Sequence, residues 1–385
     1  MNTLTPKQAA EIAQGVYQLR TQSVSEVRRQ GLQLGCEGLF SVSDESKFQG
    51  ISGSGFKALS GFGYIAEGQG PYKGELLCVT RGTQTKLDWL SNLNVGVQNG
   101  PASHFVHAGF NEIYKSYASS ISKFLRNKNP SHIHCVGHSL GGALAMLNAD
   151  YFTSRGVAAA TLYTFGAPRT GLQRFADTLT FRVGEERIYR VSHIADPVPM
   201  IPILPFAHIP YNTPAYQLGA RGASLISVGA HSMTGSYIPG VGDKAWKGLS
   251  LDDAPVSDSE VQTWLDKTSQ GNSVLTYSAE ALRMIGRFLG WLLKKALASV
   301  GAGIGVTLTT GMTLIDQVAW LLSKGAELSN DLAGYQVAFI RATLRFLGRA
   351  VSTAYEMTTA FLRWVLGMLF GAMSSFALRA LSSVV

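Results

Sequence analysis

Charged side chains are scarce in this 385-residue chain, since Asp, Glu, Lys and Arg together make up 15% of it, against about 25% in ordinary soluble domains. There are only three cysteines, Cys36, Cys78 and Cys135, and a small, odd number argues against a disulfide framework. Cys78 and Cys135 lie in apolar, strand-like runs, which predicts buried thiols. No spacing of residues resembles a metal site, so we expect neither a metal nor another cofactor.

Two other features are missing. No basic run carries interleaved aromatic residues, so we expect the net charge of +8 to suit an anionic membrane surface and not nucleic acid. No apolar core follows a basic start at the N-terminus, which predicts that there is no signal peptide. Residues 5–8 (TPKQ) instead predict a helix start, with Thr5 as N-cap and Gln8 as its reciprocal partner. Export, if it occurs, would then use a route that removes no such peptide.

Residues 1–250 read as a domain of alternating strands and helices. Such alternation is typical of a mostly parallel sheet covered by helices on both faces. The predicted strands are residues 61–65, 75–79, 133–136, 161–165 and 187–191, and residues 143–151 have helical composition. Residues 251–275 are polar, which indicates a linker or a surface helix between two regions.

Residues 276–385 are apolar, basic and free of proline. Residues 296–315 form an uncharged run of 20 residues, long enough to span a bilayer, although a soluble helical hairpin bent at its glycines fits equally well. A second uncharged run, residues 364–378, is too short to span comfortably. Arg341, Arg345 and Arg349 share one helical face, as in a helix at a membrane interface or in an ordinary surface helix. We therefore predict a helical region with possible membrane association.

The sharpest motif is residues 137–141 (GHSLG), a G-x-S-x-G pattern. It follows a strand-like run and opens a helical one, which is the setting of a nucleophile elbow. In such a bend the serine is held in a strained backbone conformation, with its hydroxyl clear of the sheet. Ser139 is therefore the predicted nucleophile.

A serine hydroxyl needs a base to take its proton, and in this kind of sheet the acid and then the histidine follow the serine in sequence. Asp196 comes after a predicted strand and before a proline-rich loop, where its carboxylate can orient an imidazole. Two histidines follow Asp196, namely His208 and His231. We favour His231, because residues 224–228 before it could form a further strand whose loop returns over the serine.

The sequence resembles the class 3 lipases over about residues 60–240. The matching motifs, in order, are residues 80–83 (TRGT), 88–89 (DW), 92–93 (NL), 106–110 (VHAGF), 137–145 (GHSLGGALA), 164–169 (TFGAPR), 196–199 (DPVP) and the segment of His231 with Tyr237 beyond it. The last 110 residues depart from the family pattern, and so does the proline-rich segment after Asp196.

The resemblance implies an α/β-hydrolase fold and a role for each matching residue. Ser139 would attack an ester carbonyl, His231 would carry its proton and Asp196 would hold His231. Backbone N–H groups of Thr83 and Leu140 would bind the oxyanion. Residues 84–96 would form a mobile lid with an apolar face.

The chain is therefore predicted to be a lipase or phospholipase that cleaves carboxylic esters of membrane lipids through an acyl-enzyme. The N-terminal residues 4–20 also resemble the opening of antibacterial lipase effectors of the type VI secretion system. That resemblance implies an immunity protein or a secretion component as partner, and action at a target membrane. Two other functions stay open, a membrane-inserting toxin and an esterase for soluble esters whose tail binds a partner.

Overall fold

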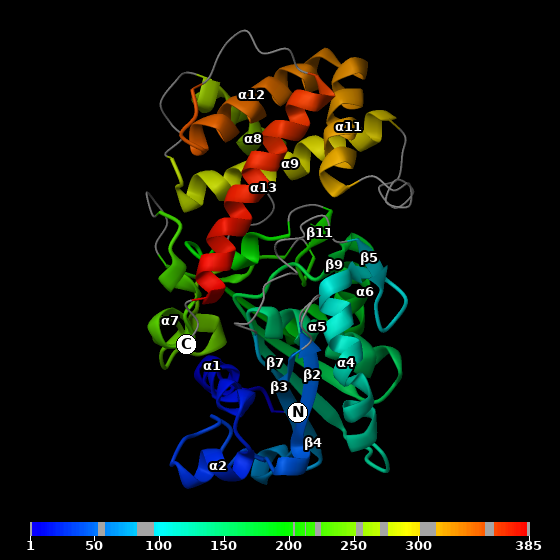
Figure 1. The fold of residues 1–385 in the computed structure, drawn as a ribbon, viewed down its shortest axis with the longest axis vertical. Coiled ribbons are helices and arrows are strands. Elements are labelled where there is room, and N and C mark those ends of the chain that lie inside the picture. The colour runs from blue at the N-terminus through cyan, green and yellow to red at the C-terminus, as the bar shows by residue number, and fades with distance from the viewer. Residues whose placement is uncertain are drawn as a thin grey trace.

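The structure is a computed structural model, and it describes residues 2–52, 58–82, 96–202, 205–211, 213–219, 225–251, 257–269, 276–300, 313–350 and 358–382. The first 250 residues form an α/β region, and the C-terminal helices form a separate layer stacked on it along the long axis (Figure 1).

A twisted sheet forms the centre of the α/β region. In the described residues its strand order is β1-β3-β4-β7-β8-β10-β12, with β2 paired to β3. The strands are β1 Phe40–Ser41, β2 Lys47–Ser52, β3 Ala58–Gly68, β4 Glu75–Thr80, β7 His132–His138, β8 Ala159–Phe165, β10 Ile188–His193 and β12 Tyr216–Leu218. The strands from β4 to β12 run parallel, whereas β1, β2 and β3 pair antiparallel. The prediction of a mostly parallel sheet is confirmed.

Successive residues of the central strands pack on opposite faces of the sheet, as the two-residue period of a strand requires. Cys78 and Cys135 contribute to the cluster under α4 Ala108–Phe124, α5 Leu140–Ser154 and α6 Gln173–Val183. Val79 and Val136 contribute to the cluster under α1 Pro6–Gly15 and α7 Ile238–Val241. Both faces are therefore covered, and the cysteines are free and buried as predicted.

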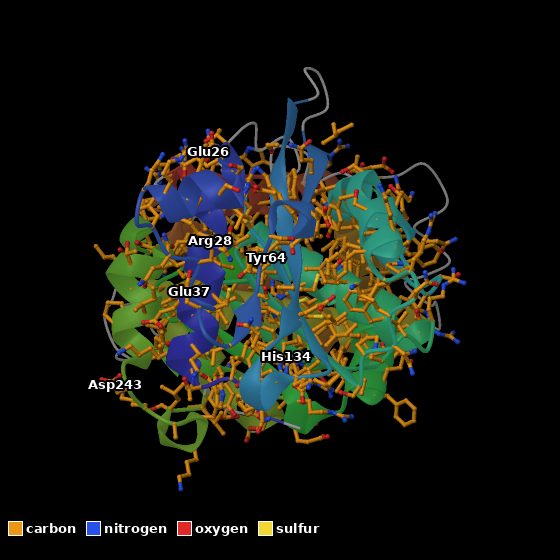
Figure 2. The ribbon with its side chains drawn as sticks, turned by 90° about the horizontal axis from the view of Figure 1, so that it is seen from below. Glu26, Arg28, Glu37, Tyr64, His134 and Asp243 are labelled. Atoms are coloured by element: carbon orange, nitrogen blue, oxygen red, sulfur yellow. The ribbon has the colours of Figure 1, made fainter. Side chains whose placement is uncertain are left out.

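The N-terminal segment lies over the second of these faces. Figure 2 shows it beside the strands that carry Tyr64 and His134. The predicted start of α1 is confirmed, because Thr5 accepts from the backbone N–H of Gln8 while the Gln8 side chain accepts from that of Thr5. α2 Val24–Arg29 follows.

A smaller sheet lies beside the main one, in the order β11-β9-β6-β5. Its strands are β5 Val97–Asn99, β6 Phe105–His107, β9 Gly171–Leu172 and β11 Phe206–Ala207.

One predicted strand is wrong. Leu225 makes only an isolated bridge to Ser278, and a 3-10 turn begins at Val228. The strand that pairs with β10 is β12, earlier in the chain. Apolar residues at 225, 226 and 228 mimic a strand, but Ile226 and Val228 are partly buried against the helical layer and not within the sheet.

The C-terminal layer consists of α8 Asp258–Ser269, α9 Ala279–Val300, α11 Leu314–Leu328, α12 Asn330–Phe346 and α13 Thr359–Ser382. α8 falls within the stretch predicted as a linker or a surface helix, and it packs on α12. The 20-residue uncharged run ends α9 and begins α11, and its residues 301–312 lie outside the described ranges. The shorter run is part of α13, which extends beyond it at both ends. By length and composition, α13 is the one helix among the described residues that could cross a membrane.

Candidate active site

Ser139 occupies a sharp bend between β7 and α5. Its backbone has φ 61° and ψ −136°, a conformation that costs a non-glycine residue free energy and is typical of functional sites. The bend is possible because its two flanking glycines lie against backbone. A Cβ at Gly137 would lie 2.2 Å from the Gly141 carbonyl oxygen, and one at Gly141 would lie 2.2 Å from the Thr80 carbonyl oxygen. The G-x-S-x-G pattern is therefore required by close packing.

The structure brings the three predicted side chains together. Ser139 Oγ lies 2.9 Å from His231 Nε2, and His231 Nδ1 lies 2.8 Å from Asp196 Oδ2. All three residues are buried. With Nδ1–H donating to the carboxylate, His231 Nε2 is the free base that can take the serine proton.

Asp196 follows β10 in a tight turn. Its Oδ1 accepts from the Val198 N–H at 2.9 Å, and its Oδ2 accepts from Tyr237 Oη–H at 2.7 Å as well as from His231. The backbone N–H of His193 donates in turn to the Tyr237 hydroxyl oxygen at 3.2 Å. Because the phenol is buried beside this carboxylate, the Tyr237 pKa is raised well above its usual range, by burial first and then by Asp196. Tyr237 therefore stays a proton donor that orients the acid.

The alternative base, His208, follows β11 instead. Burial first, then the neighbouring Arg190 and Arg169, lower the pKa of His208 well below its usual range. The geometry selects His231, as the sequence analysis favoured.

A second chain of hydrogen bonds runs beneath Ser139. The Gly82 N–H donates to the Tyr17 hydroxyl oxygen at 3.1 Å, and that hydroxyl lies 2.9 Å from His138 Nδ1. His138 Nε2 lies 2.9 Å from the His231 carbonyl oxygen, which can only accept. His138 Nε2 therefore carries the proton, and its Nδ1 accepts from Tyr17.

Burial lowers the pKa of His138 well below its usual range, with His231 adding to the effect, so this imidazole stays neutral. The chain links the loop before Thr83, the elbow and the histidine turn (Val228–His231, the 3-10 turn that carries His231). Sequence reasoning missed Tyr17 and His138 as parts of the site. The only signal for His138 was its place within the motif, and Tyr17 gave none.

Leu140, one of the two predicted oxyanion donors, is buried at the first position of α5. N–H groups at that end of a helix have no partner within it. Thr83, the other predicted donor, lies outside the described residues, as does the predicted lid up to residue 95.

The residues just before Thr83 are firmly held. The buried Arg81 guanidinium donates to the carbonyl oxygens of Gly61 and Gly82 and, at 2.8 Å, to Ser60 Oγ. Burial lowers its pKa to about 10, so it remains a cation. Gly82 thus has its carbonyl fixed by Arg81 and its N–H fixed by Tyr17.

Comparison with known proteins shows which part of the chain is similar to a described family. Residues 77–206 match the family model of the class 3 lipases. The matched segment contains Ser139 and Asp196 and ends before His231, so the assignment of the histidine depends on the structure. Within the described residues, no group of His, Cys, Asp and Glu could hold a metal ion.

Two curated relatives illustrate the similarity. The chain is 36% identical over 150 residues to secreted mono- and diacylglycerol lipase 1 of Fusarium solani, which covers 37% of this chain and 44% of the relative. It is 29% identical over 174 residues to phospholipase A1-II 2 of Oryza sativa subsp. indica. This match covers 35% of this chain and 43% of the relative. The chain thus spans less than half the length of these relatives.

Among solved structures, a mutant form of MDLA from Penicillium cyclopium aligns with 67% of this chain and 87% of its own, at 20% identity and a TM-score of 0.43.

Proposed function

We propose that this protein is a serine lipase that hydrolyses carboxylic esters of lipids through an acyl-enzyme. The observation that carries the proposal is the hydrogen-bonded row of Ser139, His231 and Asp196 at a strained strand-to-helix bend. The matched class 3 lipase segment supports the same chemistry.

In the proposed first step, His231 Nε2 takes the hydroxyl proton as Ser139 Oγ bonds to the ester carbonyl carbon. The carbonyl oxygen becomes an oxyanion beside the Leu140 N–H, a preorganised donor of the kind that contributes about 3–4 kcal/mol to such a transition state. When the intermediate collapses, the bond to the alcohol breaks and the alcohol leaves with the proton from His231. Asp196 stabilises the imidazolium that exists between these events.

In the second step, water attacks the acyl-enzyme and gives its proton to His231. The bond to Ser139 Oγ then breaks, the serine recovers its proton, and a fatty acid is released. The relatives include a mono- and diacylglycerol lipase and a phospholipase A1. We extend the proposal to phospholipids because the basic, apolar helical layer suits an anionic lipid surface.

The test is product analysis by mass spectrometry after incubation with mixed phospholipid and diacylglycerol vesicles. Wild-type protein should release free fatty acid together with a lysolipid or monoacylglycerol, whereas Ser139→Ala should release at least about 10³-fold less. A matched control is Ser154→Ala, at the far end of the same helix, which should behave as wild type. Equal fatty acid release by Ser139→Ala would refute the proposal.

The effector role stays a prediction from the N-terminal resemblance, as does an immunity protein as partner. The membrane-inserting alternative makes a different prediction, namely that Ser139→Ala permeabilises vesicles as well as wild type does.

A further inference from the structure

The acid and the base of the proposed triad lie on separate turns, and one residue joins the two. The Ser227 N–H donates to the Ala195 carbonyl oxygen at 2.9 Å, and the Ser227 carbonyl oxygen accepts from the Ala230 N–H at 3.2 Å. Ala195 directly precedes Asp196, and Ala230 directly precedes His231. The position of the acid relative to the base therefore depends on where Ser227 is held.

The C-terminal helices hold Ser227 through backbone hydrogen bonds. The residue before it, Ile226, donates its N–H to the Tyr277 carbonyl oxygen at 3.2 Å. The Tyr277 N–H donates in turn at 3.0 Å to the carbonyl oxygen of Phe346, the last residue of α12. The isolated bridge of Leu225 joins the same two segments. A continuous row of backbone contacts thus leads from the end of α12 to the residues that precede the acid and the base.

Tyr277 is the point at which three helices of the layer meet. Its φ of 53° is positive, a conformation that is unfavourable for a residue with a side chain and that persists only where the surroundings impose it. Its ring contacts Phe346 of α12 and Phe376 of α13, at centroid distances of 5.7 and 5.4 Å. The next residue, Ser278, caps α9, because its hydroxyl oxygen accepts from the Ala281 N–H at 3.3 Å.

Small side chains then bring the start of α9 against both turns. Ala279, the first residue of α9, is 0% exposed. It packs in one buried cluster with Ile194 and Ala195 on the acid side and Ala230 on the base side. Three of these four residues are alanines, so the backbones approach closely and a larger side chain at position 279 would force them apart.

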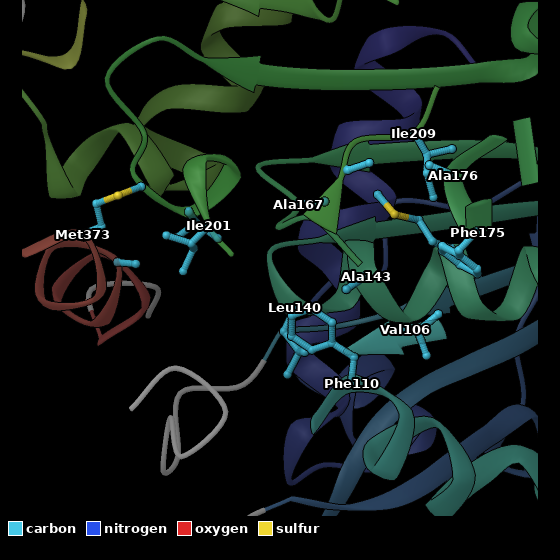
Figure 3. Packing of buried hydrophobic residues seen from close by; sticks show 14 of the residues in the cluster. Val106, Phe110, Leu140, Ala143, Ala167, Phe175, Ala176, Ile201, Ile209 and Met373 are labelled. Atoms are coloured by element: carbon cyan, nitrogen blue, oxygen red, sulfur yellow. The ribbon is translucent and has the colours of Figure 1, made fainter. Parts of the chain in front are cut away.

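The last helix also contacts both turns. α13 packs against the histidine turn and against the acid turn (Val198–Met200, the 3-10 turn that follows Asp196). Met373 of α13 and Ile201, which directly follows the acid turn, belong to one buried cluster (Figure 3). Both turns therefore have the helical layer behind them.

We propose that the C-terminal helical layer supports the proposed catalytic centre, and that Tyr277 and Ala279 are positioning residues for Asp196 and His231. The inference rests on the proposed function. A displacement of about 1 Å between reacting groups can cost about 10² in rate, so loosening this support should lower kcat even on a soluble ester with no lipid present. A tail that only binds lipid or a partner predicts no such loss.

The first test is the series Ala279→Ser, Ala279→Val and Ala279→Leu in the full chain. Each larger side chain should push the start of α9 further from the two turns. The matched control is the same series at Ala296, a buried alanine of the same helix that lies against Gly325 of α11. Ala296 is 17 positions further along, or about 25 Å at 1.5 Å per residue. The substrate is a water-soluble short-chain ester without any lipid surface.

In the Ala279 series kcat should fall stepwise, to about 10–100-fold below wild type for Ala279→Leu, with KM little changed. The rate of covalent labelling by a fluorophosphonate, which reports the activation of Ser139, should fall with kcat. The Ala296 series should lower the melting temperature and leave kcat within about twofold of wild type. A wild-type kcat in Ala279→Leu, or an equal loss in Ala296→Leu, would overturn the inference.

A second pair of variants tests the backbone row alone. Tyr277→Asn and Tyr277→Pro both remove the aromatic ring, so the difference between them reports only the backbone. Asparagine tolerates a positive φ and keeps the N–H, whereas proline fixes φ near about −65° and has no N–H to donate. Tyr277→Pro should therefore have a kcat at least about 10-fold below that of Tyr277→Asn.

Equal kcat values in these two variants would count against the inference. Absence of Ser139-dependent hydrolysis in wild type would instead refute the proposed function, so the two failures are distinguishable.

Discussion

Tyr17→Phe removes a single hydroxyl that lies between Gly82, just before the predicted oxyanion donor Thr83, and His138, just before Ser139. Without it, the buried Gly82 N–H and His138 Nδ1 both lose their partner. A buried polar group left unpaired costs about 1–3 kcal/mol, so we expect the free energy of unfolding to fall by about 2–4 kcal/mol. Denaturant unfolding of variant and wild type measures this loss.

The same substitution should slow the chemistry. Gly82 precedes Thr83, a predicted oxyanion donor, and losing one such donor costs about 10²–10³ in kcat. Displacing a donor that is still present should reduce kcat less than removing it. We therefore expect kcat on a soluble ester to fall about 10–100-fold, with KM little changed.

The control is Tyr117→Phe. This buried hydroxyl donates to Asn148 Oδ1 at 3.2 Å on the α4 side of the sheet, so its loss should lower stability but not kcat. A wild-type kcat in Tyr17→Phe, or an equal fall in the control, would refute the reasoning.

Four further predictions follow from buried residues. Tyr237→Phe removes a donor to the Asp196 carboxylate and should lower the free energy of unfolding by about 1.5–3 kcal/mol and reduce kcat, as denaturant titration and initial rates will show. Gly141→Ala places a Cβ 2.2 Å from a carbonyl oxygen of β4, so hydrolysis should be lost together with the near-ultraviolet dichroism of the packed elbow. Burial lowers the pKa of His107 to about 4 from 6.5. The free energy of unfolding should therefore fall by up to about 3 kcal/mol as the pH falls between these two values. Burial raises the pKa of Asp150 to about 6 from 3.8. The contribution of Asp150 to the free energy of unfolding should therefore fall as the pH rises from about 4 to 6. Unfolding of His107→Gln and Asp150→Asn against pH should therefore deviate from wild type in opposite directions, and parallel curves would contradict both assignments.

The parts of the site that the sequence could predict are those encoded by neighbouring residues. The elbow at Ser139 needs glycines two positions away on either side, and both the motif and its strand-to-helix setting can be read locally. The rule that the acid and then the histidine follow the serine narrowed the choice to Asp196 with His231 or His208. The strand predicted at residues 224–228 was wrong because its apolar residues pack on C-terminal helices, and a local pattern cannot show which partner covers an apolar run.

The supporting residues could not be predicted for a related reason. Tyr17 and His138 are 121 positions apart, and a tyrosine on a short N-terminal helix is ordinarily a packing residue. The full extent of α13 could not be predicted from its uncharged run either. Its uncharged core of 15 residues indicated a run too short to span a bilayer, but the helix continues through Arg363 and Arg379 because nothing in those turns ends it.

Burial of the triad has two opposed consequences. Excluding water strengthens the Asp196–His231 interaction and the action of backbone donors on an oxyanion, because both are electrostatic and grow as the local dielectric constant falls. The same burial means that an ester must reach a serine that is only 1% exposed. Hydrogen bonds from Tyr17 and Tyr237 should therefore set the rate of chemistry once a substrate is bound.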